Sequence, residues 1–332
     1  MSLKTNASKA IACANIALIK YWGKRDTALN LPAVGSISIT LDALQTETCL
    51  RFREDLEQDK LTINNQIASE KQRSRVTKFL DIVRVRENIN QFAEVSSINN
   101  FPTGAGLASS ASAFAALTLA ATDALGMMIS KKEQSKLARK GSGSAARSIF
   151  GGFVEMLAGQ DPAGKDAFAI QLAPASYWDL RVLILITSAE EKSTGSTEAM
   201  NLTAMTSPYY ENWITDSIHD LNEMRTAIRS KDFEKLGELA EYNALKMHAL
   251  TLSSRPPIIY WNHTTIDLIH HIQALRKRGI PAYFTIDAGP QVKVITLPAH
   301  VSSLKSEFKS VFGIKEIVES ALGPDATVIG VE

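Results

Sequence analysis

The amino-acid sequence predicts an α+β fold in which two mixed layers of strands and helices meet along one cleft. Residues 1–188 contain many strand-like segments with β-branched side chains, separated by a few helical segments. Residues 189–332 differ in predicted secondary structure, because long helical segments dominate and only a few strands interrupt them. The chain has 332 residues, of which 45% are apolar, so it can build the core of two closely packed domains.

The first expected domain, residues 1–188, supplies most of the strands. Alternating or continuous apolar patterns predict strands at residues 9–14, 36–41, 48–52, 92–98, 151–157 and 181–187. Helical spacing predicts helices at residues 73–86, 109–125 and 131–139.

The second expected domain, residues 189–332, is mostly helical. Helices are predicted at residues 197–205, 209–229, 233–250, 264–278 and 301–311, and short strands alternate with the last of these helices. Two strands, at 283–287 and 292–296, flank the tetrapeptide Asp-Ala-Gly-Pro. No linker rich in Pro, Gly or Ser marks the boundary near Ser188.

The charge of the chain is balanced, with 36 Lys and Arg against 35 Asp and Glu. This argues against nucleic-acid or membrane-surface binding by the whole protein, so a bound anion would need a local cluster of cations. Cys13 and Cys49 form no disulfide or metal pattern, and we expect both to be buried thiols. There is no apolar run of signal-peptide or membrane-spanning length, and the expected location is the cytoplasm.

A glycine-rich turn, PTGAGLASSAS at residues 102–112, leads into an Ala-rich helical segment. Gly104 and Gly106 let the backbone approach a ligand closely, and Ser109 and Ser110 stand where the helix should begin. Free N–H groups at a helix N-terminus bind anions, so a triphosphate is a natural occupant. The spacing matches neither a Walker loop nor a dinucleotide fingerprint. On this segment alone, a plain turn capped by serines remains an equal alternative.

Two further segments concentrate groups that bind anions. Residues 15–32, NIALIKYWGKRDTALNLP, place three cations and a phenol within six positions, although spacing alone favours an ordinary basic surface turn. Residues 142–147, SGSAAR, combine two hydroxyls with Arg147, whose planar fork suits a carboxylate or phosphate. A solvated loop is an equal alternative for the second segment.

The last candidate residue is an aspartate. Asp287 ends a predicted strand before Ala-Gly-Pro, where it is either a turn residue or a carboxylate that faces the cleft.

Together these segments resemble the diphosphomevalonate decarboxylases, a branch of the GHMP superfamily that contains galactokinase, homoserine kinase, mevalonate kinase and phosphomevalonate kinase. IKYWGKRD is close to a signature of that branch. In GLASS, residues 106–110, alanine stands where most of the kinases have glycine, and this also resembles the decarboxylases. The match extends over nearly the whole chain. It implies a GHMP-kinase-like fold with an N-terminal ribosomal-protein-S5-like, ATP-binding domain and a C-terminal α/β-plait-like domain sharing one active-site cleft.

The resemblance also implies roles for individual residues. The residues that would act in catalysis are Asp287, Lys20 and Arg147. Those that would bind substrate are Tyr21, Trp22, Gly23, Lys24, Arg75, Ser142, Gly143, Ser144, Ala145, Ala146, Arg147, Ser196 and Thr197. Those that would bind ATP are Pro102, Gly104, Ala105, Gly106, Leu107, Ala108, Ser109 and Ser110.

Three positions depart from the family pattern or align with it less closely. Ala146 replaces a family cysteine, Thr197 stands where some bacterial members have arginine, and Arg75 has a solvated helical position as its alternative. Mg²⁺ is expected with ATP, although the pattern names no ligand beyond Ser110 as a candidate. His248 is expected to be structural.

The implied reaction is the ATP-dependent decarboxylation of (R)-5-diphosphomevalonate to isopentenyl diphosphate, CO2, ADP and phosphate. Small-molecule ligands, no nucleic acid or membrane, and a homodimer are expected. The alternatives are a mevalonate or phosphomevalonate kinase of the same fold, a decarboxylase of the monophosphate, and an inactive homologue that only binds ligand.

Overall fold

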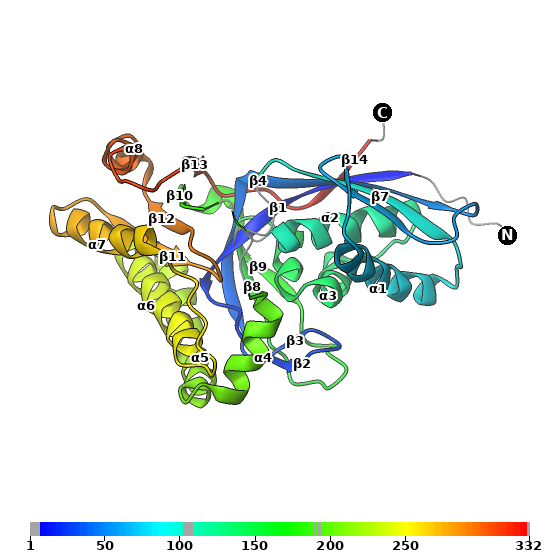
Figure 1. The fold of residues 1–332 in the computed structure, drawn as a ribbon, viewed down its shortest axis with the longest axis horizontal. Coiled ribbons are helices and arrows are strands. Elements are labelled where there is room, and N and C mark those ends of the chain that lie inside the picture. Colours follow the sequence, from blue (N-terminus) through cyan, green and yellow to red (C-terminus); the bar gives the residue numbers. More distant parts are fainter. Residues whose placement is uncertain (1–6, 102–108, 189, 191–193, 331–332) are drawn as a thin grey trace.

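The computed structural model describes residues 7–101, 109–188, 190 and 194–330. Within this part of the chain there are three sheets, of which the two larger ones are each covered by helices (Figure 1). The larger sheet has the strand order β14-β1-β4-β7-β5-β6, and β8 and β9 are attached through β4. The smaller sheet has the order β11-β12-β10-β13. The α+β class expected from the sequence is confirmed.

The larger sheet is built on two long antiparallel strands, β1 and β4. Its strands are β1 (Ser8–Ile19), β4 (Ser36–Arg53), β5 (Lys60–Ile63), β6 (Gln66–Ile67), β7 (Phe92–Asn99), β8 (Phe153–Met156), β9 (Ala169–Ala173) and β14 (Thr327–Ile329). The two strands expected at 36–41 and 48–52 are one strand, because pairing with β1 and β7 keeps the residues between them extended.

Three helices pack on the larger sheet: α1 (Glu70–Glu87), α2 (Ser109–Ala124) and α3 (Lys131–Gly141). α2 lies closest to β1 and β4. Its buried alanines, among them Ala116 and Ala120, have small side chains that let the helix approach the strands. This packing brings the start of α2 to the middle of the molecule.

The smaller sheet consists of β10 (Arg181–Ile186), β11 (Ala282–Ile286), β12 (Val292–Thr296) and β13 (Glu316–Ser320). One face packs against α7 (His263–Lys277) and α8 (Val301–Lys309). The other face packs against α5 (Tyr210–Ser230) and α6 (Phe233–Leu252) and continues into the larger sheet. β10 precedes Ser188 in sequence yet lies in this sheet; the division of the chain at that residue stays a prediction.

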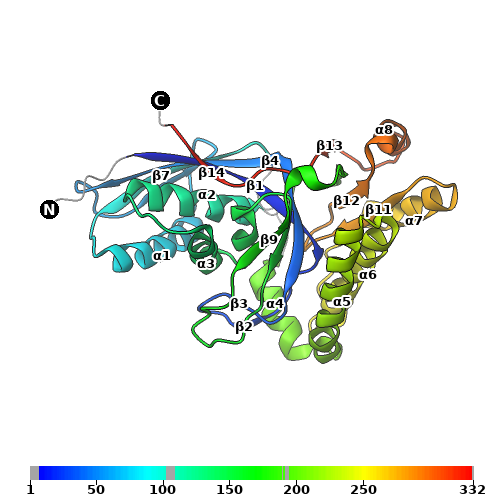
Figure 2. The same ribbon diagram turned by 180° about the vertical axis from the view of Figure 1, so that it is seen from behind.

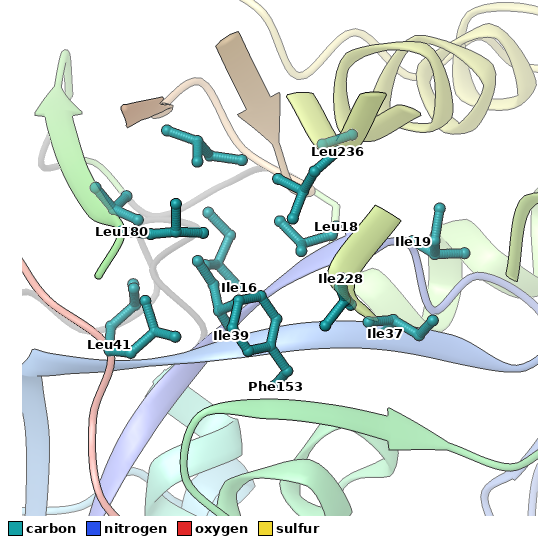
Figure 3. Packing of buried hydrophobic residues seen from close by; sticks show 14 of the residues in the cluster. Ile16, Leu18, Ile19, Ile37, Ile39, Leu41, Phe153, Leu180, Ile228 and Leu236 are labelled. Atoms are coloured by element: carbon teal, nitrogen blue, oxygen red, sulfur yellow. The ribbon is translucent and has the colours of Figure 1, made fainter. Parts of the chain in front are cut away.

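A single apolar core joins the two sheets. Ile16 and Ile39 of the larger sheet belong to the same cluster as Ile184 of β10, Ile228 of α5 and Leu236 of α6. Figure 3 shows β1 and β4 side chains facing those of α5, α6 and Leu180. Since these side chains interdigitate, the ends of β1 and β11 are held at a fixed distance from each other.

Short elements complete the molecule. They are the hairpin β2 (Lys24–Asp26) and β3 (Leu31–Pro32), the helix α4 (Ser196–Thr206), and the 3₁₀ turns η1 (Gly143–Ile149), η2 (Ala175–Tyr177) and η3 (Pro298–His300). After β13 the chain returns to the larger sheet, where β14 pairs antiparallel with β1 (Figure 2). Within the described ranges, no helix is both long and apolar enough to cross a membrane.

The two cysteines differ in burial. Cys13 is buried, as expected, and burial raises the pKa of its thiol to about 11. The expectation that Cys49 is also buried is wrong, because its position on β4 leaves it partly exposed. Neither forms a disulfide in the described part of the chain.

Candidate active site

The centre of the site is an ion pair between residues from the two sheets. Lys20 directly follows β1, and its ammonium donates to Asp287 Oδ1 at 2.7 Å and to the Ala17 carbonyl at 2.9 Å. Asp287 directly follows β11. The side chain of Lys20 is 1% exposed, whereas that of Asp287 is 24% exposed. The carboxylate therefore remains open to a ligand while the ammonium is held behind it.

Electrostatics keep this pair charged. Burial opposes the ionisation of Asp287, but Lys20 and Lys293 outweigh it and hold the pKa of Asp287 well below its ordinary value. Burial lowers the pKa of Lys20 to about 8, against the opposing effect of Asp287. Near neutral pH, the site therefore contains a carboxylate and an ammonium whose proton is more easily lost than usual.

Helix α6 fixes the backbone of Lys20. The Lys20 N–H donates to Asn243 Oδ1 at 2.7 Å, and the Asn243 amide donates to Asp220 at 2.6 Å. Lys246 in turn pairs with Asp220 at 2.5 Å. Sequence reasoning missed this chain of contacts, because a single Asn on a helix resembles a solvated residue.

Arg147 lies in η1, which follows α3, and is 2% exposed. Its guanidinium donates to Ser36 at 2.5 Å, to Ser38 at 3.0 Å and to Asn15 at 3.0 Å. Burial lowers the pKa of Arg147 to about 10, and Asp287 and Tyr21 oppose this. Three neutral partners on β1 and β4 thus orient a buried cation near Asp287.

A row of hydroxyls connects α2 with η1. Ser110, in the first turn of α2, lies 3.3 Å from Ser142, and Ser142 lies 3.2 Å from Ser144. The phenol of Tyr21 is close to the same turn, because a Cβ on Gly143 would stand 2.3 Å from its oxygen. This buried oxygen has no hydrogen-bond partner among the described residues. Burial raises the pKa of Tyr21, so the phenol stays neutral and can donate to an anion.

A second group of cations borders the site at the start of α4. The Lys24 ammonium donates to Asn30 at 2.6 Å and to Thr197 at 3.0 Å. Burial, together with Arg75, lowers the pKa of Lys24 to about 8. Arg75 projects from α1 over the ring of Phe114, at 5.3 Å from its centroid. Ser196 and Thr197 begin α4, where the positive end of the helix dipole favours an anion.

Four other residues expected to bind substrate are buried, and that role stays a prediction for each of them. Trp22 is 1% exposed, and its indole N–H donates to Thr203. Ala145 and Ala146 are completely buried in two different apolar clusters. Gly23 has a φ of 92° and approaches Tyr210, so a side chain there would be both strained and crowded. These residues shape the turns that carry Tyr21, Lys24 and Arg147.

The expected ATP turn lies mostly outside the described residues. This applies to Pro102, Gly104, Ala105, Gly106, Leu107 and Ala108. The described residues Ser109 and Ser110 start α2 as expected. In the described ranges, no three His, Cys, Asp or Glu side chains gather into a metal site. Mg²⁺ commonly keeps several waters and takes phosphate oxygens as ligands, so the hydroxyls beside this helix start suit such an ion.

His248 is buried behind the ion pair. Its ring packs on Trp261 with centroids 4.7 Å apart. Burial, followed by the effect of Lys20, lowers the pKa of His248 to about 3, so its imidazole is neutral. The structural role expected for this residue stays a prediction.

Two family models match the chain. Residues 12–169 match the diphosphomevalonate decarboxylase-like N-terminal domain. Residues 182–328 match the mevalonate 5-diphosphate decarboxylase C-terminal domain.

Individual relatives match over nearly the full length. The diphosphomevalonate decarboxylase of Candida albicans is 38% identical, with 96% of each chain covered. The mevalonate diphosphate decarboxylase of Enterococcus faecalis has a solved structure with a TM-score of 0.91 and 40% identity, covering 98% of this chain and 99% of that one. A structure described as MDDEF in complex with MVAPP, AMPPCP and magnesium has a TM-score of 0.92, 40% identity and the same coverage.

Proposed function

The chain belongs to the diphosphomevalonate decarboxylase family, and we propose that it converts (R)-5-diphosphomevalonate and ATP into isopentenyl diphosphate, CO2, ADP and phosphate. The observation that carries this proposal is the contact between Lys20 and Asp287, with Lys293 of β12 and Arg147 of η1 as further cations beside it. Such a site suits a substrate that is an anion at both ends and reacts at a neutral carbon between them.

The chemistry requires two stages. The tertiary hydroxyl first attacks the γ-phosphorus of ATP, its proton passes to solvent, and ADP departs. The bond between the tertiary carbon and the phosphorylated oxygen then breaks and releases phosphate, which leaves positive charge on the tertiary carbon. Finally, the electrons of the bond to the carboxylate form the alkene, and CO2 departs. Without phosphorylation the leaving group would be hydroxide, which departs poorly.

Three residues are assigned to the reacting end of the substrate. Asp287 orients the tertiary hydroxyl and, as an anion, stabilises the cation that develops on the carbon. Lys20 neutralises charge on the transferred phosphoryl group. Arg147 holds the substrate carboxylate together with Ser144, and its fixed guanidinium plane sets the angle at which CO2 leaves.

The diphosphate end is assigned to the groups beside α2, η1 and α4. Tyr21 and Ser142 supply hydroxyl donors, Lys24 supplies a cation, and Ser196 lies at a helix N-terminus. Binding of the diphosphate orients the reacting end of the substrate, because binding energy from a distant group can be used to restrict the motion of the reacting atoms. Arg75 and Thr197 border the same region, where Arg75 extends the positive potential and the Thr197 hydroxyl accepts from Lys24.

ATP is assigned to the segment 102–110, with Ser109 and Ser110 at the start of α2. Their hydroxyls and the first N–H groups of the helix would bind phosphate oxygens and, through the phosphates, Mg²⁺. Bound there, the ion would neutralise charge on the phosphates during transfer.

The proposal is tested with purified protein, ATP and Mg²⁺, offered 5-diphosphomevalonate or 5-phosphomevalonate in parallel. We expect equal amounts of CO2, phosphate and ADP from the diphosphate, and much slower turnover of the monophosphate. ADP without CO2 would indicate a kinase instead. Preference for the monophosphate would reassign the substrate, and no ATP consumption with any substrate would indicate a binding protein.

Two further assignments follow from the family resemblance and are offered as proposals. One is a homodimer, which sedimentation velocity would test. The other is a cytoplasmic location, which is supported by the two unpaired cysteines of the described chain and would be tested by cell fractionation.

A further inference from the structure

Strand β12 carries a buried lysine that contacts the same aspartate. The ammonium of Lys293 lies 3.4 Å from Asp287 Oδ2, while Lys20 holds Oδ1 at 2.7 Å. Its side chain is 3% exposed. Each carboxylate oxygen of Asp287 therefore has its own ammonium.

The position of Lys293 in the sheet makes this arrangement costly for folding. Its cross-strand partners are Ile184 on β10 and Thr285 on β11, and its neighbours on β12 are Val292 and Val294. An apolar side chain would fit this sheet without the desolvation cost of an ammonium. Since Lys20 alone would neutralise Asp287, the second lysine is not required to compensate the carboxylate.

The charged groups around Asp287 show what the second lysine adds. From the end of β1 comes Lys20, from β12 comes Lys293, and from η1 comes Arg147, while His248 on α6 is neutral. Three cations surround one carboxylate. Before any ligand binds, the site thus has an excess of positive charge, which suits a polyanion.

The proposed reaction requires two roles of Lys20. It compensates Asp287 in the free protein, and it must turn toward the phosphoryl group during transfer. A carboxylate that lost its only cation partner would bind a proton more readily and would stop stabilising positive charge on the tertiary carbon.

We propose that Lys293 is a positioning residue that holds Asp287 in the orientation and charge state needed for the reaction while Lys20 engages the transferred phosphoryl group. This inference rests on the proposed function for its kinetic consequence. Its electrostatic consequence can be measured in the free protein, without substrate. In the free protein, burial of Asp287 raises the pKa of its carboxyl, but the contacts with Lys20 and Lys293 outweigh burial and keep this pKa low.

The test compares the wild-type protein with Lys293→Met, which keeps much of the side-chain length and removes the charge. Carboxyl ¹³C NMR of protein labelled at aspartate would follow the protonation of Asp287 as the pH is lowered, with assignment from Asp287→Asn. We expect this carboxyl to take up its proton at a pH roughly 1 unit or more higher in the variant. We also expect kcat to fall by roughly tenfold or more, with KM changed far less.

Arg276→Met is the matched control. It removes a cation from the pair with Glu241, which lies beside β11 and accepts the Phe284 N–H, away from Asp287. It should reduce stability without moving the titration of Asp287. If Lys293→Met does not fold, Lys293→Gln keeps a polar group and replaces it.

An unchanged titration of Asp287 in a folded Lys293 variant would overturn the inference, even if the wild-type protein releases CO2. A loss of activity that appears only in KM, or that Arg276→Met reproduces, would also overturn it. If the titration moves but the wild-type protein shows no decarboxylation, the electrostatic role of Lys293 stands and the proposed function fails.

Discussion

The ammonium of Lys20 lies 2.7 Å from the carboxylate of Asp287, although 267 positions separate the two residues. Lys20 follows β1 of the larger sheet and Asp287 follows β11 of the smaller one. A second contact supports the first, because the Thr285 hydroxyl donates to the same Ala17 carbonyl that accepts from Lys20. The site is therefore a product of the junction between the two sheets.

The charge of Lys20 predicts an alkaline limit to activity. Burial lowers the pKa of this ammonium to about 8, so it is protonated below that pH and loses its charge as the pH rises through it. We expect kcat/KM to fall above about pH 8. Asp287, with its lowered pKa, should stay ionised throughout the neutral range.

Lys24 has a pKa lowered to about the same value, so a control is needed. In Lys24→Arg the guanidinium keeps its proton, and the alkaline fall should persist in kcat/KM. If the fall disappears in this variant, Lys24 and not Lys20 sets the limit.

Arg147→Lys keeps the positive charge and removes the planar fork. The guanidinium has three polar partners on β1 and β4, and a lysine ammonium cannot reproduce their geometry. We expect kcat/KM to drop by roughly 10²-fold, measured by steady-state kinetics. Kinetics equal to wild type would remove Arg147 from the reacting end.

Gly143→Ala should displace Tyr21. The added Cβ would stand 2.3 Å from the phenol oxygen, so the ring must move away from η1. We expect KM for the diphosphate substrate to rise by roughly tenfold or more. The matched control is Gly330→Ala, where a Cβ meets nothing within 4 Å and activity should be unchanged. An unaltered KM in Gly143→Ala would separate Tyr21 from diphosphate binding.

Much of the fold could be predicted from local patterns. The helix that begins at Ser109 and the strand 292–296 follow directly from composition and periodicity. The sequence predicts short strands around the last helix but not their bounds, because β13 and β14 exist through pairing with β10 and β1, and their own residues show no clear alternation. The 3₁₀ turn η1 could not be predicted either, because its sequence resembles an ordinary Ser/Gly loop.

The candidate site could be predicted only in part, because some of its residues stand in local motifs and others act through contacts that form only on folding. Lys20 and Arg147 could be predicted, because each stands in a short segment that contains several groups able to bind an anion. Lys293 and Asn243 are single polar residues within a strand and a helix, and they act through contacts made only in the folded chain. The available signal for Lys293 was a charged residue at the second position of the otherwise largely apolar run 292–296.

The most direct measurement of the central claim is single-turnover kinetics of Asp287→Asn with 5-diphosphomevalonate and ATP. Substrate affinity should stay within a few-fold of wild type, because the groups beside η1 and α4 hold the diphosphate. Release of CO2 should slow by roughly 10²-fold or more, since the amide cannot supply the anion. A rate of CO2 release near that of the wild-type protein would contradict the account.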